Sequence, residues 1–162
     1  MNENSEIRVA GKKFIDIEQV FAGKSPKMSR LIPGFVFKYL KRIIHQDELN
    51  DVLERYKDKM GLDFIDHILD EFGAKIIVEG INNMPAEGRY IVAANHPLGG
   101  LDGMVLMKVV GKVRPDILFP VNDLLMYLPN LKPLFIPINK HGRNTENLRI
   151  FDDAFASDSV IL

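Results

Sequence analysis

Residues 93–103 read Ala-Ala-Asn-His-Pro-Leu-Gly-Gly-Leu-Asp-Gly, and this stretch sets a histidine and a carboxylate six positions apart across a glycine-rich turn. The segment before it, residues 89–94, has the β-branched and aromatic content of a buried strand. The segment after it, residues 104–110, is apolar enough for a helix or a second buried strand. Loops that leave the ends of sheet strands carry binding and catalytic groups in α/β proteins. The stretch therefore predicts a catalytic loop in an α/β fold.

His96 and Asp102 are the candidate catalytic residues of this loop. Of all side chains, an imidazole exchanges protons closest to neutral pH, which suits His96 to the role of a general base. A carboxylate on one ring nitrogen fixes the tautomer and stabilises the imidazolium that forms, which is the role predicted for Asp102. The chain has no cysteine and the loop has no serine, so direct proton abstraction from an acceptor is favoured over a covalent triad. The alternative is that His96 is a structural histidine before a proline.

The order Asn-His-Pro followed by Gly-Gly-Leu-Asp-Gly resembles the signature of the glycerolipid acyltransferase family, which includes the lysophosphatidic-acid acyltransferases. Residues 132–140 are similar to the second block of that family, an apolar strand that ends in a basic residue, here Lys140, assigned to the phosphate of the acceptor. Residues 76–85 resemble the strand and turn that lead into the histidine motif, so the similarity covers residues 72–162. The resemblance implies that His96 deprotonates the acceptor hydroxyl or amine, which then attacks the thioester of an acyl carrier.

Two features depart from the family pattern. Five residues separate His96 from Asp102, where the family usually has four, although a pair of glycines can absorb the extra residue. The Gly-Gly-Leu-Asp-Gly form is similar to a bacterial subgroup described as hemolysin-like, which includes enzymes that acylate amino acids to make ornithine or glycine lipids. The sequence ends at residue 162 within an apolar run, before the third block of the family. We therefore expect it to be the front part of a longer enzyme, and to be slow or inactive by itself.

The candidate substrate-binding residues lie in two loops. Asn95 and the amides of Gly99 and Gly100 are expected to shape the histidine loop. Lys140 and Arg143 flank a glycine before a predicted helix, where amides and a guanidinium favour phosphate or carboxylate. We expect these two bases to hold the polar head of the acceptor or the phosphopantetheine of the carrier. The alternative for this second loop is a solvated surface.

The apolar residues 104–110 and 119–128 are expected to line a groove for the acyl chain. No metal site is assigned, because ordinary contacts along a helix explain the spacing of His67 from Asp63 and Asp70 better than a metal does. No cofactor and no nucleic acid partner are expected. The resemblance implies acyl-CoA or acyl carrier protein as the co-substrate and a lipid as the acceptor.

The composition describes one globular domain's worth of chain. Of its 162 residues, 46% are hydrophobic and 27% are charged, which is enough for a sizeable core. No apolar stretch approaches the roughly 20 residues that span a bilayer, and the N-terminus lacks the basic start and apolar core of a signal peptide. The absence of cysteine fits a reducing compartment. We therefore expect a cytoplasmic protein.

The charges are unevenly distributed. Residues 8–45 carry nine bases and two acids, a net charge of +7, whereas residues 46–87 carry four bases and eleven acids, a net charge of −7. Residues 29–45 have the pattern of an interfacial amphipathic helix, which predicts peripheral contact with the anionic inner face of the cell membrane. Its apolar positions are 32, 35, 36, 39, 40, 43 and 44, and its basic side chains are Lys38, Lys41, Arg42 and His45. The alternatives are a core-facing helix and pairing between the two oppositely charged parts.

Strands and helices alternate after the histidine loop. Strands are predicted at 116–121, 134–138 and 159–162, helices at 46–60, 62–73 and 144–155, and a helical turn at 122–128. Pro137 favours an edge strand or a bulge. We therefore predict an α/β fold with a mixed, partly parallel sheet covered by helices. A helical N-terminal segment, residues 1–72, would precede the front part of an acyltransferase catalytic domain, residues 73–162.

The resemblance, together with these features, implies an acyltransferase. It would move a fatty acyl group from acyl-CoA or acyl carrier protein to the hydroxyl or amine of a lipid precursor, such as lysophosphatidic acid or an amino acid. One alternative is a binding module for lipid or acyl carrier, which would tolerate the loss of His96. Another is an acyl-thioester hydrolase, which would use the same base and give the acyl group to water.

Overall fold

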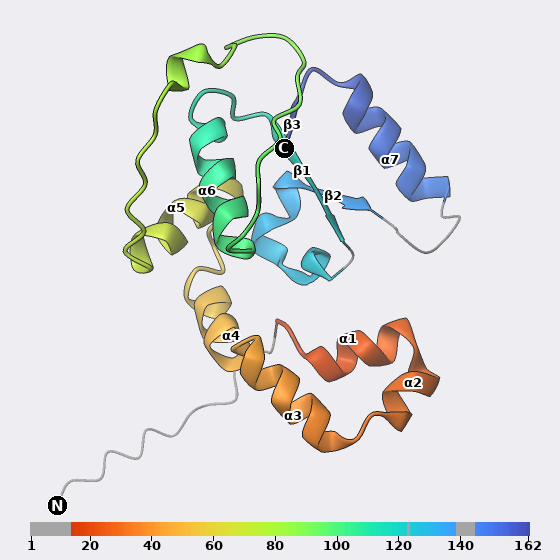
Figure 1. The fold of residues 1–162 in the computed structure, drawn as a ribbon. Helices are drawn as coiled ribbons and strands as arrows, with labels where there is room; N and C mark the ends of the chain where they lie inside the picture. Colours follow the sequence, from red (N-terminus) through yellow and green to blue (C-terminus); the bar gives the residue numbers. More distant parts are fainter. Residues whose placement is uncertain (1–13, 123, 139–144) are drawn as a thin grey trace, which may run out of the picture. The chain divides into compact units, whose positions relative to one another are not determined.

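The computed structural model describes residues 14–122, 124–138 and 145–162 (Figure 1). It divides the chain into two compact units, the first ending at Lys57 and the second beginning at Asp58. The boundary predicted from the sequence, after residue 72, lies further along the chain. The difference arises because helix α5 (Gly61–Glu71) packs against elements of the second unit.

The described part of the first unit, residues 14–57, contains four helices: α1 (Ile17–Lys24), α2 (Pro26–Leu31), α3 (Gly34–Ile43) and α4 (Gln46–Arg55). Gln46 is buried, and its side-chain oxygen accepts a hydrogen bond of 2.9 Å from the amide of Ile17. The side chain of Asn50 exchanges two hydrogen bonds of 2.8 Å with the backbone of Ile15. These two amide side chains therefore fasten the start of α1 to α4.

Residues 29–45 form two helices, where the sequence predicted one. Ile32 has an extended backbone, with φ −78° and ψ 119°, and Pro33 directly precedes α3. Because a proline disfavours the helical conformation of the residue before it, the helix is interrupted at Ile32. Phe37 of α3 is buried, and its ring meets Phe21 of α1 edge to face with 5.8 Å between the centroids.

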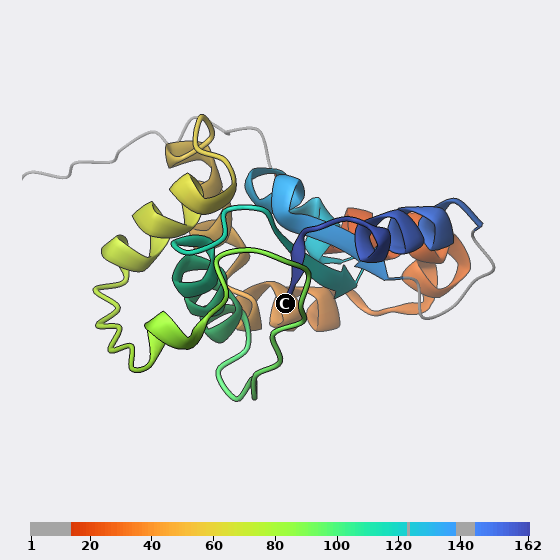
Figure 2. The same ribbon diagram turned by 90° about the horizontal axis from the view of Figure 1, so that it is seen from above.

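The described part of the second unit is built around a parallel three-stranded sheet in the order β2-β1-β3. The strands are β1 (Ile117–Asn122), β2 (Phe135–Ile138) and β3 (Val160–Ile161). Helices α5 and α6 (Gly100–Gly111) lie on one side of the sheet and α7 (Thr145–Ala156) on the other (Figure 1 and Figure 2). Short 3-10 helices occupy Ile81–Asn83, Leu125–Tyr127 and Pro129–Leu134. The predicted α/β fold is confirmed, and β2 lies at one edge of the sheet that the described residues form, which is one of the two alternatives, edge strand or bulge, that Pro137 favoured.

Close packing fixes the helices on the sheet. Gly111 lets α6 approach α5, since a Cβ at this position would lie 2.7 Å from both Cδ atoms of Leu62. On the other side, Ala154 of α7 packs with Ile136 and Ile161 of the strands. The sheet is therefore covered on both sides, and α6, which begins directly after the histidine loop, is held in place by α5 and β1.

The segments before the histidine loop differ from the prediction. Residues 89–94 do not form a full buried strand: their parallel pairing is a single bridge from Ile91 to Ile161, and Ile91 is 65% exposed. The amide of Val92 donates to the oxygen of Ile161, and the amide of Ile161 donates to the oxygen of Tyr90. The pairing is short because β3 has only two residues. Residues 76–80, which resemble a family strand, form no strand within the described part of the chain.

The boundary between α4 and α5 differs from the prediction. The helix expected over residues 46–60 ends at Arg55, and a turn follows it. Gly61, which directly follows the predicted helix, begins α5 with a φ of +57°. This left-handed conformation suits glycine and turns the chain sharply into the next helix.

Candidate active site

Along the chain, His96 lies between Ile91, which forms a bridge to Ile161 of β3, and helix α6. A turn at residues 97–99 leads into α6, which begins at Gly100. Gly99 has φ +64° and ψ −128°, a combination that side chains in the L configuration rarely adopt. This reversal brings Asp102, in the first turn of α6, back toward His96.

The side chains of His96 and Asp102 lie 3.8 Å apart, measured from Nδ1 to Oδ2. The distance is longer than a hydrogen bond but short enough for an ion pair when the imidazole is protonated. The same Oδ2 accepts a short hydrogen bond from the amide of Leu98, and the positive end of the helix dipole favours its charge. The His96 side chain is 55% exposed, against 24% for Asp102. The imidazole is thus accessible to a substrate, while the carboxylate is held by the start of the helix.

Gly103 leaves the surface of α6 beside His96 without a side chain. An ideal Cβ on the buried Gly103 would lie 3.7 Å from Cε1 of His96 and 3.5 Å from Cζ of Phe119. The imidazole of the loop and the phenyl ring of β1 therefore both lie over this glycine. The sequence reasoning gave Gly103 no role of its own. The available signal was a glycine inside an apolar helix, where it costs about 1 kcal/mol relative to alanine.

The predicted binding residues fall into two groups in the structure. Asn95 is exposed and directly precedes His96, and Gly99 and Gly100 form the start of α6 beside the same loop. Lys140 and Arg143 lie outside the described residues. The binding roles of all these residues stay predictions.

A cavity of about 420 Å³ lies at the sheet edge, and its lining belongs to neither segment of the predicted acyl groove. Its lining residues are Arg89, Tyr90, Ile91, Phe155 and Ile161. In α6, Met107 and Val110 were expected to line the groove, but they are 3% and 1% exposed and belong to the core. These two side chains therefore contribute to packing, and the groove itself stays a prediction.

Arg114 fastens the segment that leads to the histidine loop. Its guanidinium makes two hydrogen bonds to the carboxylate of Asp116, at 2.9 and 2.7 Å, and lies over the ring of Tyr90. It also donates to the backbone oxygens of Gly88 and Asp158, both at 2.7 Å. The hydrogen bond from Arg114 lowers the pKa of the Asp116 carboxyl. The sequence reasoning missed this cluster, whose only local sign is an arginine and an aspartate two positions apart before a strand.

His67, the histidine whose spacing from Asp63 and Asp70 was considered for a metal site, makes contacts along its own helix. Nδ1 of His67 lies 2.8 Å from the backbone oxygen of Asp63 and 3.4 Å from its carboxylate. Across the three described ranges, no three His, Cys, Asp or Glu side chains gather in a way that could hold a metal ion. Nor does any helix in those ranges have the length and apolar character needed to cross a membrane.

A family model described as acyltransferase matches residues 19–162. Two curated relatives, the lyso-glycine lipid O-acyltransferases of Bacteroides thetaiotaomicron and Phocaeicola vulgatus, are each 43% identical to the chain over 150 residues. These alignments cover 91% of the chain but 55% and 54% of the relatives, so the chain spans about half the length of the curated relatives it matches. No solved structure matches it significantly. The chain belongs to the acyltransferase family, as the resemblance of residues 72–162 predicted.

Proposed function

We propose that this chain carries the catalytic base of an enzyme that transfers a fatty acyl group to the hydroxyl of a glycine lipid with one acyl chain. The observation that carries the proposal is the pair of His96 and Asp102, with its accessible imidazole, in a chain 43% identical to two lyso-glycine lipid O-acyltransferases. The sequence left a hydroxyl and an amine open as acceptors, and the activity named for these relatives favours the hydroxyl. Lysophosphatidic acid and free amino acids are the competing acceptors.

The proposed reaction needs one base and no covalent enzyme intermediate. Nε2 of neutral His96 takes the proton of the acceptor hydroxyl while the oxygen attacks the thioester carbonyl carbon. A carbon–oxygen bond forms, the carbon–sulfur bond breaks, and the imidazolium returns the proton to the leaving sulfur. The products are an ester and a free thiol.

Asp102 is proposed to support this proton transfer from the other side of the ring. Its carboxylate faces Nδ1, so it favours the tautomer that carries a proton there and leaves Nε2 free. An approach of about 1 Å between the two atoms would form a hydrogen bond and stabilise the imidazolium.

The proposed donor is acyl-CoA or acyl carrier protein, which both present the acyl group as a phosphopantetheine thioester. Asn95 and the amides of Gly99 and Gly100 would shape the loop around the reacting atoms, and Lys140 and Arg143 would hold an anionic group of acceptor or donor. Because the acceptor carries a fatty chain, we place the enzyme peripherally on the inner face of the cell membrane.

The test is an acyl-transfer assay on the longest expressible form of the protein. Acyl-CoA and acyl carrier protein serve as donors, and lyso-glycine lipid, lysophosphatidic acid, glycine and ornithine as acceptors. His96→Ala is expected to lose about 10²- to 10⁴-fold in rate, whereas His67→Ala on α5 is the matched control and should keep the wild-type rate.

Each outcome of this assay selects one function. Transfer to lyso-glycine lipid by the wild type and not by His96→Ala supports the proposal. Wild-type turnover in His96→Ala would overturn the role of the base. Donor binding without transfer would favour a binding module, and release of free fatty acid in the absence of acceptor would favour a thioester hydrolase.

A further inference from the structure

Helix α3 has two apolar faces, of which one is buried and one is exposed. Phe37 is 6% exposed, whereas Phe35, Tyr39 and Ile43 are 74%, 63% and 54% exposed. These three side chains recur at four-residue spacing and so lie along one line on the helix, which we call the outer stripe. At about 100° per residue, Tyr39 is about 200° from Phe37, so the outer stripe is opposite the buried face. Leu31, at the end of α2, is 81% exposed.

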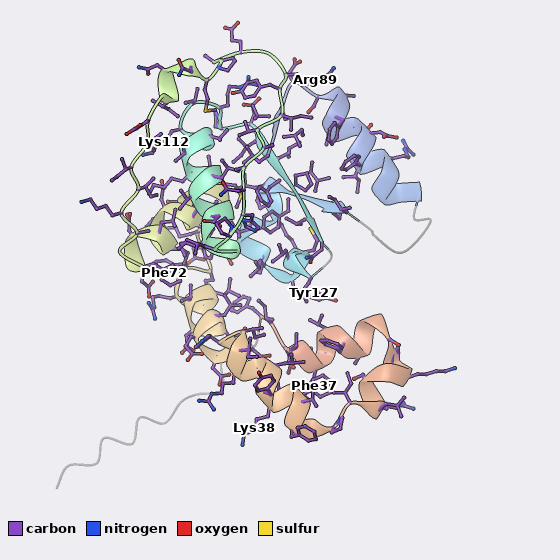
Figure 3. The ribbon with its side chains drawn as sticks, viewed as in Figure 1. Phe37, Lys38, Phe72, Arg89, Lys112 and Tyr127 are labelled. Carbon is purple, nitrogen blue, oxygen red and sulfur yellow. The ribbon has the colours of Figure 1, made fainter. Side chains whose placement is uncertain are left out.

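Bases border the outer stripe. Residues 26–43 contain no acid and five bases, namely Lys27, Arg30, Lys38, Lys41 and Arg42. Lys41 points to α1, where it pairs with Glu18 at 2.6 Å. Lys38 and Arg42 are exposed and fall on the same side of the helix as the outer stripe. Figure 3 shows Phe37 turned toward the interior of the first unit and Lys38, the next residue, turned away from it.

We infer that the outer stripe and its bordering bases form a docking surface for an anionic lipid bilayer. Large apolar side chains beside Lys and Arg, with no acid among them, match a surface that offers negative headgroups over an apolar interior. A tyrosine is well suited to this boundary, since its ring is apolar and its hydroxyl polar. The inference rests on the proposed function in one respect, because an acceptor with a fatty chain brings the enzyme to a membrane.

The structure selects a different face from the one that the sequence pattern indicated. The pattern grouped positions 32, 36, 40 and 44 with positions 35, 39 and 43 on a single apolar face. In the structure the first four are partly buried, and the other three are exposed. Only the second set, with Lys38 and Arg42, is available to lipid.

A second copy of this chain fits the outer stripe less well than a bilayer does. A two-fold contact would place the outer stripe and its bordering bases against the same residues of the other copy. Lys38 and Arg42 would then meet bases across the contact, and like charges oppose association. Anionic headgroups supply the negative charge that such a dimer lacks.

The experiment is flotation of the longest expressible form of the protein with vesicles of phosphatidylglycerol and phosphatidylcholine, compared with phosphatidylcholine alone. The wild type should bind the anionic vesicles, and the binding should weaken as salt is raised. Phe35→Ser is expected to weaken binding about tenfold or more. Its matched control is Phe72→Ser in the second unit, where Phe72 is 61% exposed. Lys38→Gln is expected to weaken binding about fivefold, and the exposed Lys112→Gln less than about twofold (Figure 3).

Three results would overturn the inference. The first is a wild type that does not bind anionic vesicles, and the second is a Phe35→Ser variant that binds them like the wild type with an unchanged circular dichroism spectrum. The third is a dimer, measured by light scattering, that Phe35→Ser converts to a monomer, because the surface would then belong to a second copy.

Acyl transfer in detergent micelles separates this inference from the proposed function. With the acceptor dispersed in detergent, Phe35→Ser should keep the wild-type rate while it fails to bind vesicles. A wild type that binds vesicles through the outer stripe but transfers no acyl group would contradict the proposed function and leave the docking surface supported.

Discussion

The carboxylate of Asp102 accepts a hydrogen bond from the amide of Leu98 while it lies 3.8 Å from Nδ1 of His96. One side chain therefore closes the turn at the start of α6 and also faces the proposed base. Because the hydrogen bond to Leu98 holds the Asp102 carboxylate against the turn, the extra residue between His96 and Asp102 does not move the carboxylate away from the imidazole. Substitutions at position 102 can distinguish the structural role from the chemical one.

Asp102→Asn is expected to lower kcat by about 10²-fold or more, because the neutral amide cannot stabilise an imidazolium. Its side-chain oxygen still accepts from Leu98, so Tm should change little. Asp102→Ala should lose the same activity and also about 0.5–2 kcal/mol of stability, since the helix start loses its acceptor and its charge. Kinetics and thermal unfolding of the same preparations measure both effects. An Asp102→Asn variant with wild-type kcat would leave this residue as a cap alone.

Gly99→Ala is expected to destabilise the protein by about 1–3 kcal/mol, because φ +64° with ψ −128° is strained for alanine. Space is not the reason, since nothing lies within 4 Å of an added Cβ at Gly99 or at Gly100. Gly100→Ala is therefore the matched control, and in the first turn of α6 it should be neutral or stabilising by up to about 1 kcal/mol. Urea unfolding compares the two, and equal effects would show that the conformation of Gly99 is not required.

Local patterns predicted the elements that local chemistry determines. The strands near 116–121 and 134–138 and the helix near 144–155 follow residue patterns that do not depend on distant partners. The approach of Asp102 to His96 agrees with the sequence prediction, because the glycines between them mark a reversal; the sequence left a helix or a strand open for the segment that follows, and the structure has helix α6 there. These features place the candidate site without any knowledge of the tertiary packing.

Tertiary contacts decide the rest of the fold. Phe37 and Tyr39 are both aromatic and two residues apart, but only Phe37 is buried, because Phe21 packs against it. Arg114 bonds to backbone oxygens 26 and 44 residues away, and no local spacing indicates such partners. The prediction of a buried strand over 89–94 was wrong for the same reason, since the burial of these residues depends on the segment that pairs with them.

The pair of Arg114 and Asp116 predicts a contribution to stability that acid removes. The hydrogen bond from Arg114 lowers the pKa of Asp116 below its ordinary value of 3.8. Folding therefore favours the charged carboxylate, and this contribution is complete above the unfolded-state pKa and is lost as pH falls through the folded-state pKa. Asp116→Asn should be less stable than the wild type at neutral pH, and the difference should shrink below pH ~4. Urea unfolding at both pH values tests this, and a difference that stays constant would contradict it.

The contact between α5 and α6 predicts a coupled pair of substitutions. An alanine Cβ at Gly111 would lie 2.7 Å from Cδ1 and Cδ2 of Leu62, so the leucine must move. We expect Gly111→Ala to cost about 1–3 kcal/mol, whereas Gly103→Ala, with neighbours at 3.5 and 3.7 Å, should cost little. In a Leu62→Ala background the added methyl has room, so the cost of Gly111→Ala should fall. Urea unfolding across this double-mutant cycle measures the coupling, and strictly additive effects would show that the two helices adjust their spacing rather than repel the methyl.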